Sequence, residues 1–292
     1  MYDLFRGLRL VLLPLAFGAI LVAATACSAV PKAPAGSPSL AAMLEASTLV
    51  DLTHSYDATT LYWPTDTFGF RLEEVSKGIN AAGFFYAANR FCTAEHGGTH
   101  LDAPIHFAEH GASIDQLALG QLLAPAVVID VTAKTAADAD YRLSAEDVAA
   151  FEAAHGKIAP GSIVLLRTGW GKFWPQRKPY FGDDRPGETG NLHFPSYGIE
   201  AAKLLVEGRQ VAALGLDTPS IDYGPSKDFL VHREAGAHGV AGFENLRNLD
   251  CLPPTGAYLI ALPMKIGGGS GGPLRAVALL PPGTAAPSCP GK

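Results

Sequence analysis

Residues 96–106 read HGGTHLDAPIH, and they hold three of the nine histidines in this chain of 292 residues. The polar residues all stand at even positions: His96, His100, Asp102 and His106. The odd positions from 99 to 107 are mainly apolar. Side chains of an extended chain alternate between two faces, so the pattern predicts a strand with one polar and one buried face. A helix would separate Asp102 from His100 by about 200° around its axis.

A fully extended chain would not bring these side chains to one metal ion. Four residues at about 3.3 Å each put His96 and His100 roughly 13 Å apart, whereas zinc lies about 2 Å from each ligand atom. We therefore expect Gly97–Gly98 to adopt a positive φ or a bulge, and Pro104 to bend the chain before the last histidine. A solvated edge strand would explain a single histidine. Two imidazoles and a carboxylate are instead the ligands of zinc, manganese or iron.

The composition favours a globular protein without a nucleic-acid partner. The chain is 48% hydrophobic and 17% charged, which is enough to bury a substantial core. Its net charge of −6 and the lack of any Lys/Arg-rich stripe argue against nucleic-acid binding. The 32 glycines and 22 prolines indicate many tight turns, and so a strand-rich or mixed fold.

The first 26 residues have the pattern of an export signal. Arg6 and Arg9 precede an apolar run over 10–26, which is shorter than the ~20 residues of a comfortable membrane span. The following ATAC, residues 24–27, resembles a bacterial lipobox, in which Cys27 would become the lipidated first residue. Alanine stands at 24 where leucine is usual, so plain cleavage before Cys27 and an uncleaved membrane anchor stay open. We expect an exported protein, periplasmic or on the outer surface, with a lipid anchor on the membrane.

The rest of the chain divides into a tether, one domain and a tail. Residues 27–46 are rich in proline and alanine and fit a tether. A single domain is expected over 47–285, because no second linker or repeat is visible, and 286–292 form the tail. Export permits disulfides, and Cys251 and Cys289 both lie in proline-rich stretches that could pair.

Periodicity predicts a mixed α/β domain. Apolar or alternating runs indicate strands at 48–53, 68–75, 83–94, 126–132, 162–167, 211–216, 257–262 and 274–280. Helices are expected at 144–155, 196–208 and around 226–235. The first of them begins with a capping pattern, Ser144 with Asp147 three residues on, and ends at Gly156.

Several single residues carry weaker expectations. The side chains of the aromatic run 84–86 and of Trp170 are expected in the core, and Cys92 as a buried free thiol. His54 is expected to form a structural hydrogen bond, and Asp217 to cap a turn or to shape a pocket.

The stretch HGGTHLDAPIHF resembles the signature of the metal-dependent cyclase-type hydrolases, the family of bacterial kynurenine formamidase and isatin hydrolase. The resemblance extends to four further motifs: VDLTHSYD at 50–57, LLRTGW at 165–170, FENLRNLD at 243–250 and LPMKIGGGSGGPLRAVAL at 262–279. It implies a swivelling β/β/α fold in a single domain, usually assembled as a homodimer or homotetramer.

The same resemblance implies roles for individual residues. The implied metal ligands are His96, His100, Asp102, His232 and Glu244, where the last two match the family's later His and Glu, twelve positions apart. His106 is the implied catalytic acid/base, and Trp63 matches an aromatic residue that stacks on the substrate ring, with core packing as its alternative. We expect one or two zinc ions per chain, with manganese possible, and the two carboxylates as bridging ligands.

These residues fit the hydrolysis of an amide. A divalent cation can lower the pKa of bound water from about 15.7 towards 7, and the resulting hydroxide attacks a carbonyl while His106 protonates the leaving nitrogen. We predict an arylformamidase-like hydrolase of a small aromatic amide of the N-formylkynurenine type. An isatin hydrolase-like or other cyclic-amide or lactone hydrolase is the alternative. A metal-binding lipoprotein without turnover is a third, but such a protein needs no extra base.

A serine hydrolase is not indicated. The chain holds no G-x-S-x-G elbow between a strand and a helix. Its GGGSGG stretch, residues 267–272, fits either a loop that approaches the substrate or a simple turn.

Overall fold

The computed structural model describes residues 39–284, all of which fall in one compact unit. The strands are β1 (Thr48–Asp51), β2 (Arg71–Ile79), β3 (Phe85–Cys92), β4 (His100–Asp102), β5 (Leu123–Asp130), β6 (Arg142–Leu143), β7 (Ile163–Arg167), β8 (Ser196–Tyr197), β9 (Ala213–Leu216), β10 (Ala241–Glu244), β11 (Ala257–Pro263) and β12 (Gly271–Leu280). The α-helices are α1 (Leu40–Ala46), α2 (Leu119–Leu122), α3 (Thr132–Thr135), α4 (Ala145–His155), α5 (Arg177–Phe181), α6 (Ile199–Lys203) and α7 (Leu230–Ala237). Short 3-10 turns are η1 (Pro104–His106), η2 (Ile114–Gln116), η3 (Trp170–Phe173) and η5 (Leu249–Cys251), and η4 (Leu204–Gly208) is π-helical.

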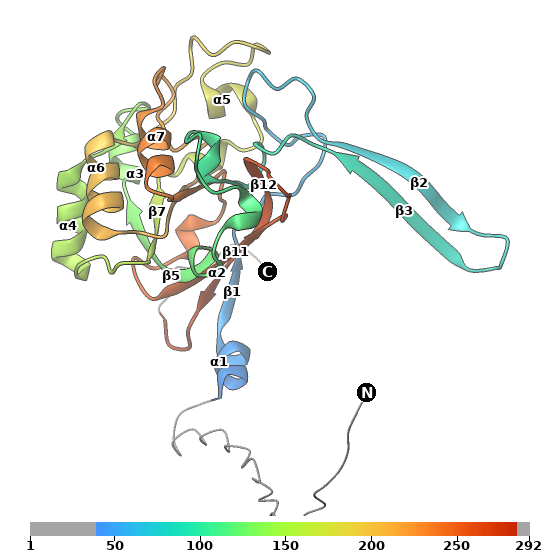
Figure 1. The fold of residues 1–292 in the computed structure, drawn as a ribbon, viewed down its shortest axis with the longest axis horizontal. Coiled ribbons are helices and arrows are strands. Elements are labelled where there is room, and N and C mark those ends of the chain that lie inside the picture. Colours follow the sequence, from blue (N-terminus) through green and yellow to red (C-terminus); the bar gives the residue numbers. More distant parts are fainter. Residues whose placement is uncertain (1–38, 285–292) are drawn as a thin grey trace, which may run out of the picture. The chain divides into compact units, whose positions relative to one another are not determined.

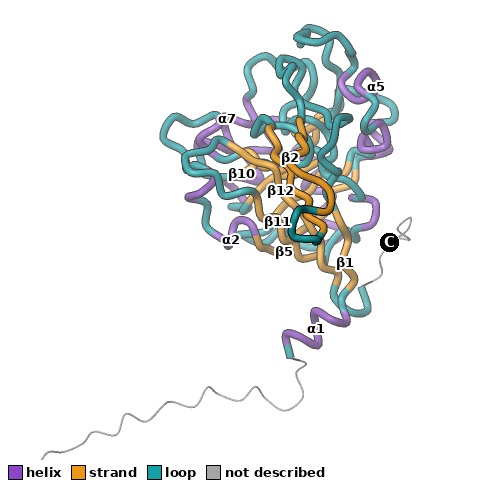
Figure 2. The backbone as a smooth tube through the Cα atoms, turned by 90° about the vertical axis from the view of Figure 1, so that its right-hand side faces the viewer, coloured by secondary structure: helices purple, strands orange, loops and turns teal. Residues whose placement is uncertain are grey.

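The main sheet curls until it closes on itself. Its order is β1-β12-β11-β5-β7-β9-β10-β4, and β4 pairs with β12 as well as with β10. Closure is possible because β12 is long: Gly271–Pro273 pair with β4, while its far end pairs with β1. Strands β12 to β4 thus form a barrel-like ring, with β1 as an extra strand beside β12 (Figures 1 and 2).

The core lies on both faces of the parallel strands. In β7, Ile163 and Leu165 belong to a cluster inside the ring, while Val164 and Leu166 pack in a second cluster beneath the helices. Helices α4, α6 and α7 lie together over that outer face (Figure 1). Parallel strands buried on both faces read as continuous apolar runs, which is why SIVLLR and VAALGL were recognisable as strands.

Most predicted elements are present, with shifted ends. The eight predicted strands correspond to β1, β2, β3, β5, β7, β9, β11 and β12, and α4 has the expected capping box between Ser144 and Asp147. The predicted helix 196–208 begins instead with the short strand β8 before α6 and η4. Helix α1 occupies part of the stretch expected as a tether. No helix within 39–284 is long and apolar enough to cross a membrane.

The β2–β3 hairpin, called the arm below, corrects two of the core predictions. It projects from the body as a separate ribbon (Figure 1). Phe84, Phe85 and Tyr86 are exposed on it, and Cys92 is an exposed free thiol instead of a buried one. The predictions were wrong because alternation specifies the faces of a strand but not whether another element covers them.

Cys251, by contrast, is buried at the end of η5. Cys289, its predicted partner, lies outside the described residues, so that disulfide stays a prediction.

Candidate metal centre

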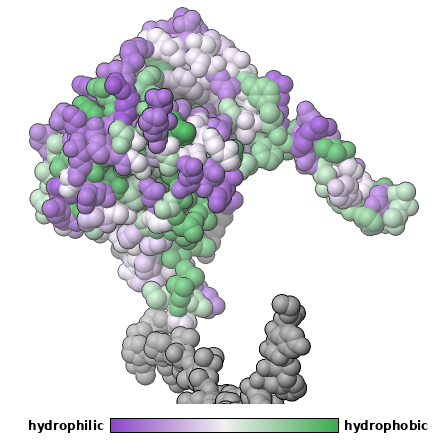
Figure 3. Space-filling model, in the orientation of Figure 1, coloured by the Kyte–Doolittle hydropathy of each residue, from purple (hydrophilic) through white to green (hydrophobic). Residues whose placement is uncertain are grey.

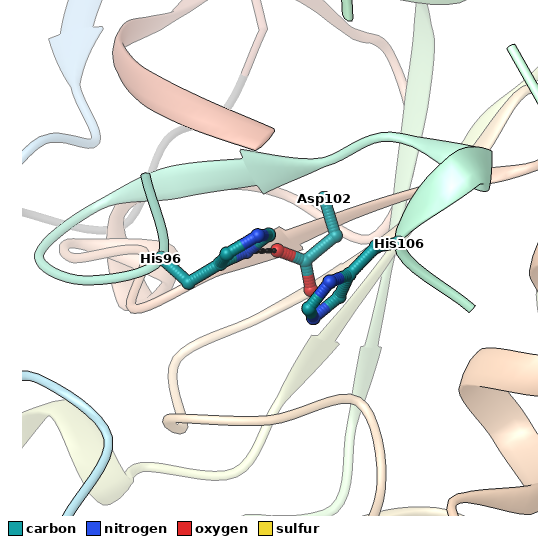
Figure 4. A group of neighbouring side chains, drawn as sticks. All are labelled: His96, Asp102 and His106. Atoms are coloured by element: carbon teal, nitrogen blue, oxygen red, sulfur yellow. Dashed lines mark hydrogen bonds and ion pairs between the residues drawn. The ribbon is translucent and has the colours of Figure 1, made fainter. Parts of the chain in front are cut away.

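The stretch 96–106 forms one side of a buried polar cluster. Strand β4 carries His100 and Asp102, both buried, and the turn η1 brings His106 back towards them. The Asp102 Oδ1 atom lies 2.6 Å from His96 Nδ1 and 3.1 Å from His100 Nε2. Figure 4 shows the carboxylate of Asp102 beside the rings of His96 and His106, which stack with centroids 3.8 Å apart. The predicted extended segment is confirmed for β4, and Pro104 ends it as expected.

The glycine doublet Gly97–Gly98 allows the chain to turn between His96 and His100. Gly98 has φ +58°, and a Cβ there would lie 2.6 Å from the ring of Tyr56. The Tyr56 hydroxyl donates a hydrogen bond to the carbonyl of Gly97 at 3.0 Å. A side chain at 98 is therefore excluded by both backbone conformation and space.

Two residues far along the chain complete the cluster. Glu244 on β10 pairs in register with His100 on β4, and His232 projects from α7. The Nε2 atom of His232 lies 3.2 Å from Asp102 Oδ2 and 3.2 Å from Glu244 Oε1. The structure thus brings all five predicted ligands together, with both oxygens of each carboxylate facing an imidazole.

Hydrogen bonds on the outer side of each imidazole orient it. The Nδ1–H of His100 donates to the carbonyl of Gly98 at 3.0 Å, and that of His232 to Asp222 at 2.8 Å. On His96 it is Nε2 that contacts Ser270 Oγ, at 2.8 Å. With a proton on each outer nitrogen, the inner nitrogen of each ring has a free lone pair for a metal ion.

Sequence analysis missed the residues that hold these imidazoles. Asp222 also accepts the backbone N–H groups of Val231 and His232, which fixes the start of α7. Ser270 is held by Glu95 at 2.6 Å. Ser270 lies in the GGGSGG stretch, so that stretch reaches the cluster and does more than turn. Asp222 and Glu95 carry no local signal in the sequence.

The electrostatics of the cluster call for a cation. Burial raises the pKa of Glu244, and the neighbouring Asp102 charge raises it further. Burial opposes protonation of His100, but the charge and hydrogen bond of Asp102, the charge of Glu244 and the Gly98 carbonyl together outweigh it and raise the pKa of His100 to about 9. The negative charge of the two buried carboxylates is therefore balanced by protons on the imidazoles. A bound divalent cation would supply the same positive charge. Three imidazole nitrogens and four carboxylate oxygens fit one or two such ions.

The cluster lines part of a cavity of about 320 Å³. The walls are aromatic: Trp63, Phe107, Phe181 and Phe229. Trp63 meets Phe181 and Phe229 edge-on, with centroids 6.5 and 6.3 Å away. Trp63 therefore packs against other rings, which was the alternative expectation, and it also lines the cavity; its stacking on a substrate ring stays a prediction.

Three other residues have local structural roles. Trp170 is buried as expected, and its indole N–H donates to the Tyr180 carbonyl at 2.8 Å. Asp217 caps the turn after β7 by accepting the backbone N–H of Thr168 at 2.8 Å, with its carboxyl buried. His54 forms a structural hydrogen bond through its backbone N–H, which donates to Thr99 Oγ1 at 2.9 Å. Its ring instead stacks on Trp174 at 4.2 Å, and its buried Nε2 has no hydrogen-bond partner among the described residues.

The chain matches a known protein family over a region that contains several of the residues described above. Positions 50–223, which include β4, η1 and the Asp222 carboxylate, match the sequence profile of the family described as "Putative cyclase". The chain belongs to the cyclase family. This assignment confirms the resemblance read from HGGTHLDAPIHF and the fold class expected from it.

Characterised relatives are hydrolases. The chain is 37% identical over 207 residues to an isatin hydrolase of Roseibium aggregatum, covering 68% of this chain and 77% of the relative. It is 29% identical to a kynurenine formamidase of Salinibacter ruber, covering 78% and 96%. The structure of isatin hydrolase A from Ralstonia solanacearum superposes with a TM-score of 0.75 at 33% identity, over 85% of this chain and all of that one. This cyclase-family protein is thus a metal-dependent hydrolase that acts on carbon–nitrogen bonds.

Proposed function

We propose that the protein hydrolyses an amide bond attached to an aromatic ring, with an aryl formamide of the N-formylkynurenine type as the first candidate. The observation that carries this proposal is that the five-ligand cluster and aromatic side chains line the same cavity. A flat ring packed against Trp63 and Phe229 in that cavity would leave a substituent free to reach Asp102 and Glu244. The kynurenine formamidases among the relatives support the formamide.

The metal would be held by His96, His100, Asp102, His232 and Glu244. We propose zinc, one or two ions per chain, with manganese as the alternative, because both accept mixed nitrogen and oxygen ligands. A bound divalent cation there would polarise the amide carbonyl and lower the pKa of a water molecule. Asp102, which faces three imidazoles, and Glu244, which faces two, would be the carboxylates shared between two ions.

His106 would move the proton. Burial lowers the pKa of His106 to about 4, so the ring is neutral at pH 7. A neutral imidazole beside Asp102 can accept a proton from the attacking water and pass it to the leaving nitrogen. The aromatic walls would orient the ring and keep other water away from the scissile bond.

A cyclic aromatic amide such as isatin is the second candidate, and the charge of the cavity favours it. Among the described residues that line the cavity, none is lysine or arginine, and Asp66 is the charged residue outside the cluster. N-formylkynurenine is a zwitterion: Asp66 could pair with its ammonium, but none of the described lining residues would neutralise its carboxylate, whereas isatin carries neither charge. The relatives named isatin hydrolase support the same candidate.

Metal analysis followed by assays on both substrates tests the proposal. The purified protein should contain one to two equivalents of metal and hydrolyse at least one of N-formylkynurenine and isatin, and a chelator should abolish turnover. Full activity after the metal is removed would reject metal-dependent hydrolysis here. Stoichiometric metal with no turnover of any aromatic amide would favour a metal-binding lipoprotein.

We also propose that the protein is exported and anchored by a lipid on Cys27, which lies outside the described residues. The basic start, the short apolar run and ATAC support this. Cys27→Ser should release the protein from membranes. An unmodified mature N-terminus in mass spectrometry would contradict lipidation, and an intact Met1 would contradict export.

A further inference from the structure

Asn245 follows the proposed metal ligand Glu244 and turns the chain at the end of β10. Its φ of +55° lies in the left-handed region, which asparagine adopts more readily than most residues. Apolar side chains reach the surface along the arm (Figure 3), whereas Asn245 is only 3% exposed. A buried amide is costly to leave without hydrogen bonds, and both ends of this one have a partner.

The side chain of Asn245 links two distant parts of the chain. Its Nδ2 atom donates a hydrogen bond to the carbonyl of Gly98 at 2.7 Å. Its Oδ1 atom accepts one from the hydroxyl of Tyr180, on α5, at 2.7 Å. The amide cannot be turned over, because a carbonyl only accepts and Nδ2 must therefore face Gly98. Tyr180 is itself fully buried, so the orientation of the amide is fixed.

The Gly98 carbonyl is also the group that orients His100. It accepts the Nδ1–H of His100 at 3.0 Å, which leaves Nε2 of that ring facing Asp102 and Glu244. A carbonyl oxygen has two lone pairs, so one can serve the amide and the other the imidazole. Gly98 has φ +58°, and β4 begins only at His100, so neither a side chain nor the strand ladder holds the Gly98 peptide group.

We infer that Asn245 is a positioning residue for the metal centre: it fixes the Gly98 carbonyl and, through that carbonyl, the imidazole of His100. Tyr180 fixes the amide in turn. The inference rests on the metal site of the proposed function, because the orientation of His100 matters there as that of a ligand.

The backbone of Asn245 makes separate contacts that do not need the amide. Its carbonyl accepts the hydroxyl of Thr99 at 2.7 Å, and its N–H donates to the carbonyl of Thr218 at 3.0 Å. The segment before β4 is thus held to Asn245 at two successive residues, Gly98 and Thr99. Loss of the amide alone would free the Gly98 peptide group while these backbone contacts keep the strands together.

A direct contact with the substrate is the alternative role, because Asn245 also lines the cavity. The bonds to Gly98 and Tyr180 already engage both ends of its amide. The two roles predict different results. Loss of a substrate contact raises KM at full metal occupancy, whereas loss of a positioning residue weakens metal binding before any substrate is present.

Zinc titration of Asn245→Gly, with Asn248→Gly as the matched control, tests the inference. Both asparagines have a positive φ, which glycine accepts, and Asn248 also donates from Nδ2 to a backbone carbonyl, that of Asp51 at 2.8 Å. No imidazole of the described chain donates to the Asp51 carbonyl. Asn245→Gly should therefore bind zinc about 10-fold more weakly, as expected when the partner of a ligand is lost. Asn248→Gly should bind zinc as the wild type does.

Tyr180→Phe is the second variant, in case Asn245→Gly does not fold. It removes only the hydroxyl that fixes the amide, so zinc affinity should fall in the same direction but by less. In NMR spectra of the histidine side chains, the Nδ1–H of His100 should exchange with water faster in both variants than in the wild type, because its acceptor is no longer fixed.

Unchanged zinc affinity in Asn245→Gly and Tyr180→Phe would overturn the inference, and so would an equal loss in Asn248→Gly. A raised KM with unchanged zinc affinity would assign Asn245 to the substrate instead. A wild type that binds neither zinc nor manganese would reject the metal site together with the proposed function. A wild type that binds metal, beside variants that bind it equally well, would reject this inference alone.

Discussion

The metal-centre strand β4 and the arm show the same alternation of polar and apolar residues with opposite results. In β4, Leu101 is fully buried inside the ring, and the polar neighbours His100 and Asp102 are buried as well. In the arm, Leu72 and Ile79 lie in water. Alternation therefore tells which side chains share a face, while neighbouring elements decide which face is covered. The predictions below test how strongly each region depends on its neighbours.

The largest effect is expected at His100. His100→Ala removes an imidazole that faces both carboxylates, so the protein should lose nearly all bound metal and all measurable turnover. Metal content by mass spectrometry and amide hydrolysis would be measured together, with the exposed His238→Ala as control. Normal metal content in His100→Ala would reject this residue as a ligand.

Glu244→Gln tests the second metal ion. The substitution keeps the shape of the side chain but removes a charge that faces His232 and His100, so metal should fall to one ion or fewer and activity should drop severely. The exposed Glu207→Gln is the control. A Glu244→Gln protein with unchanged metal and full activity would show that no second ion is held there.

His106→Ala separates proton transfer from metal binding. If His106 only moves the proton, the variant should keep most of its metal and lose about 10²–10⁴-fold in rate. The ring also lies close enough to His96 and Asp102 to share an ion with them. Loss of metal in proportion to activity would therefore reassign His106 as a ligand.

Asp222→Asn tests a residue that sequence analysis missed. Asp222 orients His232 through Nδ1, and removal of such a partner typically costs 10–100-fold in metal affinity. Metal titration should show this loss, while Asp228→Asn, on the same loop, should bind normally. Equal affinities for wild type and Asp222→Asn would mean that α7 alone orients the imidazole.

The smallest effect is expected at Leu72, which forms a matched pair with Leu101. Leu101→Ala should destabilise the protein by about 2–5 kcal/mol, because it leaves a cavity inside the ring. Leu72→Ala should change the stability of the monomer by about 0.5 kcal/mol or less, because its side chain is already in water. Denaturant unfolding at low protein concentration measures both, and similar losses would show that the arm packs within its own chain.

The sequence determined the parts of this protein that depend on local geometry. The spacing of His96, His100 and Asp102 with Gly98 between them is enough to predict a metal site, because a strand period and one positive-φ residue define where those side chains point. The capping box of α4 and the apolar runs of the parallel strands are local in the same way. His232 and Glu244 had no local signal and were found through the family resemblance.

Only the tertiary structure decided which residues from other parts of the chain contact those local elements. Asp222, Glu95 and Ser270 reach the imidazoles because α7 and the loop before β12 pack beside β4, and no spacing in the chain encodes such distances. Cys92 was mispredicted for the same reason, since burial depends on the neighbouring elements and not on the residue alone. The apolar face of the arm is the clearest case. The sequence shows its alternation of apolar and polar residues, but its exposure depends on the tertiary structure, because no element of the described chain packs against it.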